Sequence, residues 1–133
     1  MFNIVLVEPE IPQNTGNISR TCAATHSVLH LVKPFGFEIS DRTLKRAGLD
    51  YWQYLDVRYY ENFNELYEKY AGTANFYFLS TKGAKVYSDV KFKNGDFLVF
   101  GKESHGLPEP LLKEHYENTL RIPMWQNLRS LNL

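Results

Sequence analysis

The sequence predicts an α/β domain in which helices flank a mostly parallel sheet. Apolar segments of strand length alternate with segments whose apolar residues recur at helical spacing, a pattern typical of parallel sheets with helical crossovers. The chain has 133 residues, of which 44% are hydrophobic and 15% aromatic, so it can bury a core of its own. We therefore expect a single domain over residues 1–133.

The first part of the chain predicts two buried strands with a helix between them. Residues 2–8 are apolar and β-branched and end at Pro9, and residues 28–32 read as a second strand, closed by Lys33 and Pro34. Between these runs, residues 17–26 place small and apolar side chains at helical spacing, and the asparagines at and before the start of this segment can cap the helix. The helix is expected to lie close against the sheet.

The middle of the chain predicts a short helix, a strand and an amphipathic helix. Residues 40–48 begin with a serine and an aspartate that can cap a helix, and they end at a glycine. Residues 55–60 read as a strand. Asn62 and Glu65 have nearly the spacing of a capping box, apolar residues then follow at helical intervals, and Gly72 ends this helix.

The second half of the chain repeats the alternation with shorter elements. Apolar runs predict strands, and a proline ahead of an apolar turn predicts the start of a helix. The expected elements are strands at 75–80, 96–100 and 119–123, a polar surface segment at 83–93, a short helix at 108–115 and a loop at 125–133. No internal repeat or linker separates them.

Charge, hydropathy and cysteine content exclude several classes of protein. Lys+Arg 15 against Asp+Glu 15 leaves no net charge, which argues against a uniformly basic RNA-binding surface but not against a local basic face. The apolar runs are too short to cross a bilayer and the N-terminus lacks a signal peptide, so we expect a cytoplasmic protein with no membrane partner. Cys22, the single cysteine, cannot form an internal disulfide and is expected to be a buried structural thiol.

Common nucleotide and metal motifs are missing from the sequence. The turn at residues 8–17 holds one glycine, where a dinucleotide fold normally needs several. Residues 95–102 have the wrong spacing for a phosphate-binding loop, and Glu103 stands where a hydroxyl should bind magnesium. The four histidines show no paired metal spacing, so we expect no metal and place the histidines at the surface or the edge of the core.

Three polar clusters follow predicted strands, at the edge where parallel sheets place their sites. In residues 14–20, Arg20 lies near the start of a helix, where a cation indicates an anionic partner; a structural role is equally open. In residues 100–108, Glu103 lies between two glycines, although taken alone it reads as a solvated loop residue. Residues 121–133 mix apolar, amide and guanidinium groups and suit a pocket for a flat heterocycle.

Ordered motifs along the whole chain carry a resemblance to a known family. The matching stretches are residues 9–17, 29–34, 46–52, 100–103 and 121–133. They resemble the SPOUT superfamily of RNA methyltransferases and, within it, the TrmL type. Enzymes of that type are tRNA (cytidine/uridine) 2′-O-methyltransferases acting on the wobble nucleotide, position 34.

The resemblance implies a SPOUT-type fold with a deep C-terminal trefoil knot and assigns site residues. The knot binds S-adenosyl-L-methionine, leaves S-adenosyl-L-homocysteine as product and needs no metal. The implied catalytic residues, with Arg20 engaging the ribose 2′-hydroxyl and Glu103 positioning Arg20 or the ribose, are Asn14, Arg20, Glu103, Ser130 and Asn132. The implied cofactor-binding residues, acting mainly through backbone groups, are Leu79, Gly101, Ile122, Ser130 and Leu131.

The resemblance also implies a homodimer that binds tRNA. In this family the helix that closes the knot would follow Leu133, so we expect the chain to lack it. Arg46, in a basic group, and Arg129, beside the predicted pocket, are the expected RNA contacts, although a solvated surface explains them as well. Two alternatives remain open, a non-catalytic RNA-binding module of the same fold and a generic nucleotide-binding α/β domain.

Overall fold

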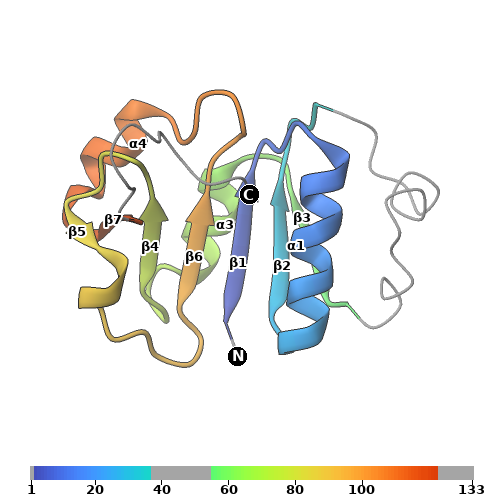
Figure 1. The fold of residues 1–133 in the computed structure, drawn as a ribbon, viewed down its shortest axis with the longest axis horizontal. Helices are drawn as coiled ribbons and strands as arrows, with labels where there is room; N and C mark the ends of the chain where they lie inside the picture. The colour runs from blue at the N-terminus through green and yellow to red at the C-terminus, as the bar shows by residue number, and fades with distance from the viewer. Residues whose placement is uncertain (1, 37–54, 123–133) are drawn as a thin grey trace.

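The computed structural model describes residues 2–36 and 55–122, and in this part of the chain seven strands form one sheet (Figure 1). The strands are β1 (Asn3–Val7), β2 (Val28–Val32), β3 (Val57–Tyr60), β4 (Phe76–Leu79), β5 (Lys85–Val86), β6 (Phe97–Phe100) and β7 (Thr119–Arg121). Their order across the sheet is β3-β2-β1-β6-β4-β7-β5, and every neighbouring pair is parallel. The predicted parallel α/β architecture is therefore confirmed.

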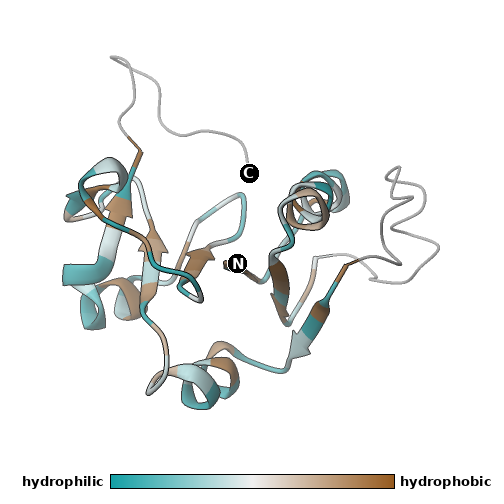
Figure 2. Ribbon diagram, turned by 90° about the horizontal axis from the view of Figure 1, so that it is seen from below, coloured by the Kyte–Doolittle hydropathy of each residue, from teal (hydrophilic) through white to brown (hydrophobic). Residues whose placement is uncertain are grey.

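Helices cover both faces of this sheet. Helix α1 (Pro12–Thr25) packs on one face, and α3 (Phe63–Tyr70) and α4 (Glu109–Glu114) contribute to the core on the other (Figure 2). Two 3-10 turns, η2 (Tyr87–Asp89) and η3 (Tyr116–Asn118), lead into the last elements. Strand β2 is buried at every position, which accounts for the apolar residues on both sides of its central His30.

Two apolar clusters hold the layers together. The cluster under α3 and α4 is rich in aromatic rings, and Phe76 and Phe97 of adjacent strands stack there with centroids 4.4 Å apart. The cluster under α1 is smaller and contains Leu6, Leu29 and Cys22. Cys22 is 1% exposed, and burial raises the pKa of its thiol to about 11, so the prediction of a buried structural thiol is confirmed.

The start of α3 confirms the predicted helix cap. Asn62 has extended backbone angles, and its side-chain oxygen accepts a hydrogen bond from the Glu65 amide at 2.9 Å. The Glu65 carboxylate reaches back to the amide of Glu61 at 3.2 Å, one residue before the cap. The arrangement is thus a capping box displaced by one residue, and it satisfies two amides that the helix itself leaves without partners.

The structure corrects two predictions about the elements, the start of the first helix and the character of the segment at 83–93. Helix α1 begins at Pro12 rather than near residue 17, with Ile11 as an N-cap that makes no side-chain cap hydrogen bond. Proline fits the first helical position because its ring fixes φ and no backbone N–H is needed there. Since the helix begins at Pro12, the asparagines that were expected to cap it lie inside it. The polar segment at 83–93 also contains β5, which adds an edge strand to the sheet beside β7.

Several predictions concern residues beyond the described ranges. The helix expected at 40–48, the loop expected at 125–133 and the segment on which the C-terminal knot depends all lie there. Within the described ranges, no helix combines the length and apolar character needed to cross a membrane.

His30 contradicts the expectation that every histidine lies at the surface or the core edge. It lies on strand β2, between β3 and β1, and is fully buried. Its Nδ1 and Nε2 lie 2.9 Å from the Tyr60 hydroxyl and from the Asn3 side-chain oxygen, respectively. Because Asn3 uses its amide nitrogen to donate to Gly95, its oxygen faces the ring, so Nε2–H donates to Asn3 and Nδ1 accepts from Tyr60.

We expect this buried histidine to make folding stability depend on pH. Burial, with a smaller contribution from Arg58, lowers the pKa of His30 from 6.5 to about 4. The unfolded chain then binds the proton more readily than the folded chain. Stability is therefore full above pH 6.5 and falls toward pH 4, by up to about 1.4 kcal/mol per pH unit.

Urea unfolding at a series of pH values between about 7 and 5 measures this slope, because few carboxylates titrate there. His30→Gln should flatten the slope, whatever its effect on absolute stability. Equal slopes in the wild type and His30→Gln would show that His30 is not its source.

Candidate functional site

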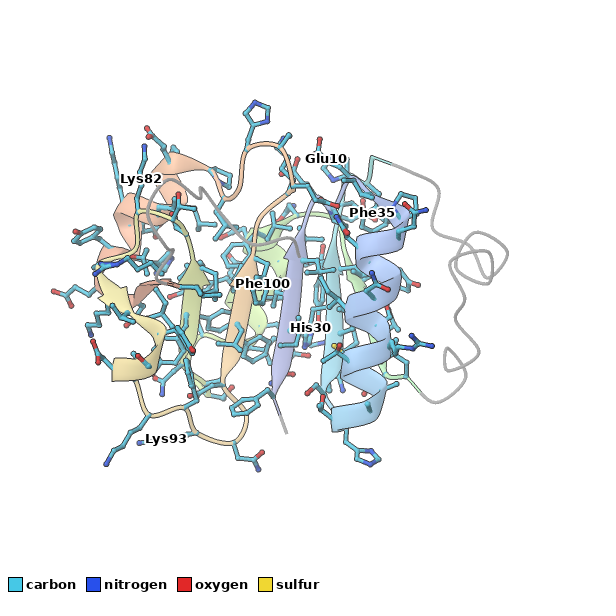
Figure 3. The ribbon with its side chains drawn as sticks, in the orientation of Figure 1. Glu10, His30, Phe35, Lys82, Lys93 and Phe100 are labelled. Carbon is cyan, nitrogen blue, oxygen red and sulfur yellow. The ribbon has the colours of Figure 1, made fainter. Side chains whose placement is uncertain are left out.

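The predicted site lies at the switch point of the sheet. Strands β2 and β3 extend the sheet on one side of β1, whereas β6 and β4 extend it on the other. The turns that follow the adjacent strands β1 and β6 therefore meet at the carboxyl edge, the position at which parallel α/β sheets bind ligands. Figure 3 shows Glu10 at this edge and Lys93 at the opposite one.

Glu103 joins the two turns through its carboxylate. Oε1 accepts from the Glu10 amide at 2.9 Å, and Oε2 accepts from the Ile11 amide at 2.8 Å and from Asn14 Nδ2 at 3.2 Å. These amides lie at the start of α1, where backbone groups lack helical partners and the helix dipole favours a negative charge. A carboxylate from the loop after the adjacent strand β6 thus binds the amide of the N-cap residue and the amide before it.

Glu10 makes the reciprocal connection. Its Oε1 accepts from the backbone amide of Ser104 at 2.9 Å and from the Ser104 hydroxyl at 2.7 Å. The Ser104 hydroxyl also lies 2.6 Å from Nδ1 of His105. The hydrogen bonds from the Ser104 hydroxyl and amide lower the pKa of Glu10. Each turn therefore offers a carboxylate to the other turn's amides.

The loop after β6 has a shape that depends on glycine. A side chain at Gly101 would overlap the backbone of Gly106 and Leu107, so the loop folds tightly back on itself. The Gly106 amide donates to the Lys102 carbonyl at 2.8 Å, and Gly106 has a φ of 68°. The glycines were predicted to let the backbone approach a ligand; what the structure shows is an approach of the loop to its own backbone.

The structure brings together two of the predicted catalytic residues. Asn14 is 5% exposed and hydrogen-bonded to Glu103, which confirms that these two polar clusters meet. Arg20 lies on the exposed surface of α1, six positions and therefore about one and two-thirds turns beyond Asn14. A pairing of Glu103 with Arg20 or with ribose stays a prediction, whereas contacts of Glu103 with the start of α1 are observed.

The predicted cofactor positions that are described lie at neighbouring strand ends. Leu79 ends β4, Gly101 follows β6 and Ile122 follows β7, and β4 lies between β6 and β7 in the sheet. Gly83 adds to this edge, since a side chain there would overlap the backbone at Leu120. The three predicted positions therefore lie along one edge of the sheet, where backbone groups of successive strand ends could hold one ligand.

Other predicted site residues lie outside the described ranges. They are Arg46, Arg129, Ser130, Leu131 and Asn132. Within residues 2–36 and 55–122, no group of three or more histidine, cysteine, aspartate or glutamate side chains is placed to hold a metal ion.

Sequence reasoning missed Glu10, Ser104 and Gly83. Glu10 lies in a matched motif, but its partner is 94 positions away, and nothing local marks that contact. The order of the strands was the signal needed, because once β1 and β6 are neighbours their following turns must adjoin. Gly83 lies in a segment predicted to be irregular, so its close approach to β7 had no local signature either.

The parallel sheet with helices on both faces defines an α/β domain, and its acidic and amide side chains gather at the switch point, the position at which such sheets bind ligands. The sequence matches the SpoU rRNA Methylase family over residues 1–133, and the chain belongs to that family. The predicted resemblance to SPOUT RNA methyltransferases is thereby confirmed.

Relatives and solved structures refine this assignment. The chain is 54% identical to a Listeria innocua protein over 134 residues, covering 98% of this chain and 79% of that one. It is 50% identical to the tRNA (cytidine(34)-2'-O)-methyltransferase of Saccharophagus degradans, covering 100% and 86%. A solved structure described as giving insight into 2-OH methylation of C/U34 on tRNA has a TM-score of 0.93 at 45% identity, covering 99% and 86%.

A more distant structure is described with a bound cofactor. It is the AdoMet-bound rRNA methyltransferase of Sinorhizobium meliloti, with a TM-score of 0.82 and 25% identity. The match covers 99% of this chain and 51% of that one. The described fold is thus shared by methyltransferases that differ widely in sequence.

Proposed function

We propose that this protein transfers a methyl group from S-adenosyl-L-methionine to the ribose 2′-hydroxyl of the wobble nucleotide, cytidine or uridine 34, of tRNA. The observation that carries the proposal is the hydrogen bond between Asn14 and Glu103 at the switch point of the sheet, beside the Gly101 loop. The relatives named for this reaction, at half identity over nearly the whole chain, support the same substrate.

The described strand ends offer a binding edge for the cofactor. Leu79, Gly101 and Ile122 would hold S-adenosyl-L-methionine, together with Ser130 and Leu131, mainly through backbone groups. When bound, this cofactor supplies an electrophilic methyl group on a sulfonium and leaves as S-adenosyl-L-homocysteine. Attack by an oxygen in line with that bond requires positioning and removal of a proton, and it requires neither a metal nor a covalent enzyme nucleophile.

Arg20 is the residue we assign to the reacting hydroxyl. Its exposed position on α1 leaves it accessible to RNA. A guanidinium stays protonated in proteins, so Arg20 would stabilise the forming alkoxide and the adjacent phosphate, while another group or water accepts the proton. Asn14 and Glu103 would hold the start of α1, and Ser130 and Asn132 would complete the site.

The proposal includes the assembly in which the reaction takes place. We propose a homodimer that acts on tRNA in the cytoplasm, with Arg46 and Arg129 among the contacts to RNA. Such contacts need only a local basic face, so the chain's zero net charge is compatible with them. A C-terminal trefoil knot, whose closing helix is expected to follow Leu133, belongs to the same proposal.

Substitution of Arg20 tests the proposed role directly. Arg20→Lys keeps the charge but loses the planar fork, so we expect methyl transfer to fall at least about 10-fold, and further in Arg20→Ala. Labelled methyl transfer from S-adenosyl-L-methionine to unmodified tRNA gives the rate, and calorimetry checks that cofactor binding is kept.

Arg58→Lys is the matched control, because Arg58 lies on strand β3 and pairs with Asp56 away from the predicted site. It should leave transfer unchanged. Near-normal transfer by Arg20→Lys with intact cofactor binding would rule out the guanidinium role. Binding of tRNA by the full-length protein without any methyl transfer would instead support the alternative of a non-catalytic RNA-binding module.

A further inference from the structure

The reciprocal contacts of Glu10 point to a role beyond the residues assigned above. The turn after β1 and the loop after β6 are joined by what we call the carboxylate clasp, formed by Glu10, Ile11, Glu103 and Ser104. Glu10 takes part in both directions: its amide donates to Glu103, and its carboxylate accepts from Ser104. Glu10 therefore takes part in the hydrogen bonds to Glu103 and in those from Ser104.

Hydrogen bonds from both turns fix the loop after β6 more firmly than the Glu103 contacts alone would. Glu103 alone would tie the loop to α1 at one carboxylate, about which the loop could still pivot. The second carboxylate, from Glu10, holds the next residue through two hydrogen bonds, to its amide and to its hydroxyl. Adjacent residues of the loop are therefore fixed at both sides, which defines the orientation of the Glu103 side chain as well as its position.

Glu10 can fix the loop because its own backbone is held. The Gly36 amide donates to the Pro9 carbonyl at 2.9 Å, so the segment after β2 contacts the turn after β1. A side chain at Gly36 would come within 2.9 Å of the Glu10 Cα, which shows how closely these backbones approach. Segments following β1, β2 and β6 thus meet at Glu10.

We propose that Glu10 is a positioning residue for methyl transfer, acting through Ser104 on the orientation of Glu103 and of the loop that begins at Gly101. This inference rests on the proposed function, since Glu103 and Gly101 are assigned to its catalytic and cofactor sites. Glu10 itself contacts neither substrate nor cofactor in this account. Its effect is transmitted by the loop.

Kinetics of three variants of the full-length protein test this role. Glu10→Ala removes both bonds to Ser104, and we expect kcat to fall between about 10-fold and 100-fold with KM for tRNA little changed. Glu10→Gln keeps Oε1 as an acceptor and should recover most of the rate. Ser104→Ala removes only the hydroxyl bond and should give a smaller loss than Glu10→Ala. Glu117→Ala, an exposed acid on η3, is the control and should match the wild type.

A double substitution separates positioning from a general effect on stability. If Glu10 acts through Glu103, adding Glu10→Ala to Glu103→Ala should lower kcat by less than about twofold more, because the orientation that Glu10 maintains no longer matters. Multiplicative losses would overturn the proposal. So would a Glu10→Gln rate as low as that of Glu10→Ala, which would make the charge rather than the hydrogen bonds the active feature.

Amide hydrogen exchange gives a readout that does not depend on the enzyme's activity. Exchange at Ser104 should rise in Glu10→Ala and not in Glu117→Ala, while core strands such as β2 stay protected in both. Unchanged exchange at Ser104 would overturn the clasp even if the wild type is an active methyltransferase. Faster exchange in Glu10→Ala, together with a wild type that transfers no methyl group, would reject the proposed function and the positioning role while leaving the clasp itself in place.

Discussion

Replacing Glu103 by glutamine is expected to lower methyl transfer by about 100-fold and the free energy of unfolding by about 1–3 kcal/mol. Both effects come from one geometric fact. The two carboxylate oxygens of Glu103 accept from three N–H donors, the backbone amides of Glu10 and Ile11 and the side-chain amide of Asn14. Glutamine has almost the same size but carries an amide nitrogen in place of one oxygen.

Either orientation of the glutamine amide fails to satisfy the turn. With its nitrogen toward Ile11, two donors face each other where the carboxylate made a 2.8 Å bond; with its nitrogen toward Glu10, the 2.9 Å bond is lost instead. An N–H group at the start of α1 is then left without its partner, and a displacement of about 1 Å at that position is enough for the expected loss of rate.

Glu109→Gln provides the matched control for this prediction. Glu109 is an exposed acid in the first turn of α4, so the same chemical change there alters no clasp contact. Methyl transfer and urea unfolding should both remain close to the wild type, within about 0.5 kcal/mol for stability. Normal transfer by Glu103→Gln would mean that the observed capping of α1 is structural only, and that the proposed site must be placed elsewhere.

Strand β2 was predictable because burial at every position leaves four of its five residues apolar. The run at 28–32 was predicted with the boundaries of β2, and its neighbours differ from prediction only at their ends. The cap of α3 was predictable for a local reason, since Asn62 and Glu65 contact each other within one turn. In each case the information lies within a few residues of the element that it specifies.

The start of α1 could not be predicted in the same way. Local signals favoured an asparagine cap, but the N-cap is Ile11, and its amide is bound by the carboxylate of Glu103, 92 positions away in the sequence. The buried His30 is a similar case, because its partners Asn3 and Tyr60 come from two other strands. Contacts across the sheet decide both, and only the strand order reveals them.

The sequence predicted some residues of the candidate site but not the hydrogen bonds that join its two turns. Asn14 and Glu103 were named as members of one site, and they are hydrogen-bonded. The resemblance supplied these residues, whereas the reasoning from residue types alone favoured a solvated Glu103. Glu10 and Ser104 were absent from the prediction because a surface acid and a surface serine carry no sign of their roles until the two turns adjoin.

Gly101→Ala is expected to be among the most damaging single changes in the described part of the chain. The added methyl group would overlap the carbonyl carbon of Gly106 and the amide nitrogen of Leu107, both backbone atoms that no side-chain rotation can move away. The loop would have to open, which breaks the 2.8 Å bond from Gly106 to Lys102 and pulls on Leu107, a buried residue of the core under α3 and α4. We expect a loss of about 2–4 kcal/mol in the free energy of unfolding.

Gly72→Ala distinguishes this steric effect from the general effect of replacing a glycine. No atom lies within 4 Å of a Cβ at Gly72, so alanine there should be neutral or should stabilise the fold slightly by restricting the unfolded chain. If urea unfolding shows equal, small effects at both positions, the loop tolerates opening and the tight turn is not required. We expect only Gly101→Ala to lower the free energy of unfolding. If calorimetry also shows weaker S-adenosyl-L-methionine binding under conditions where this variant is folded, the shape of the loop is required both for the core and for the cofactor site.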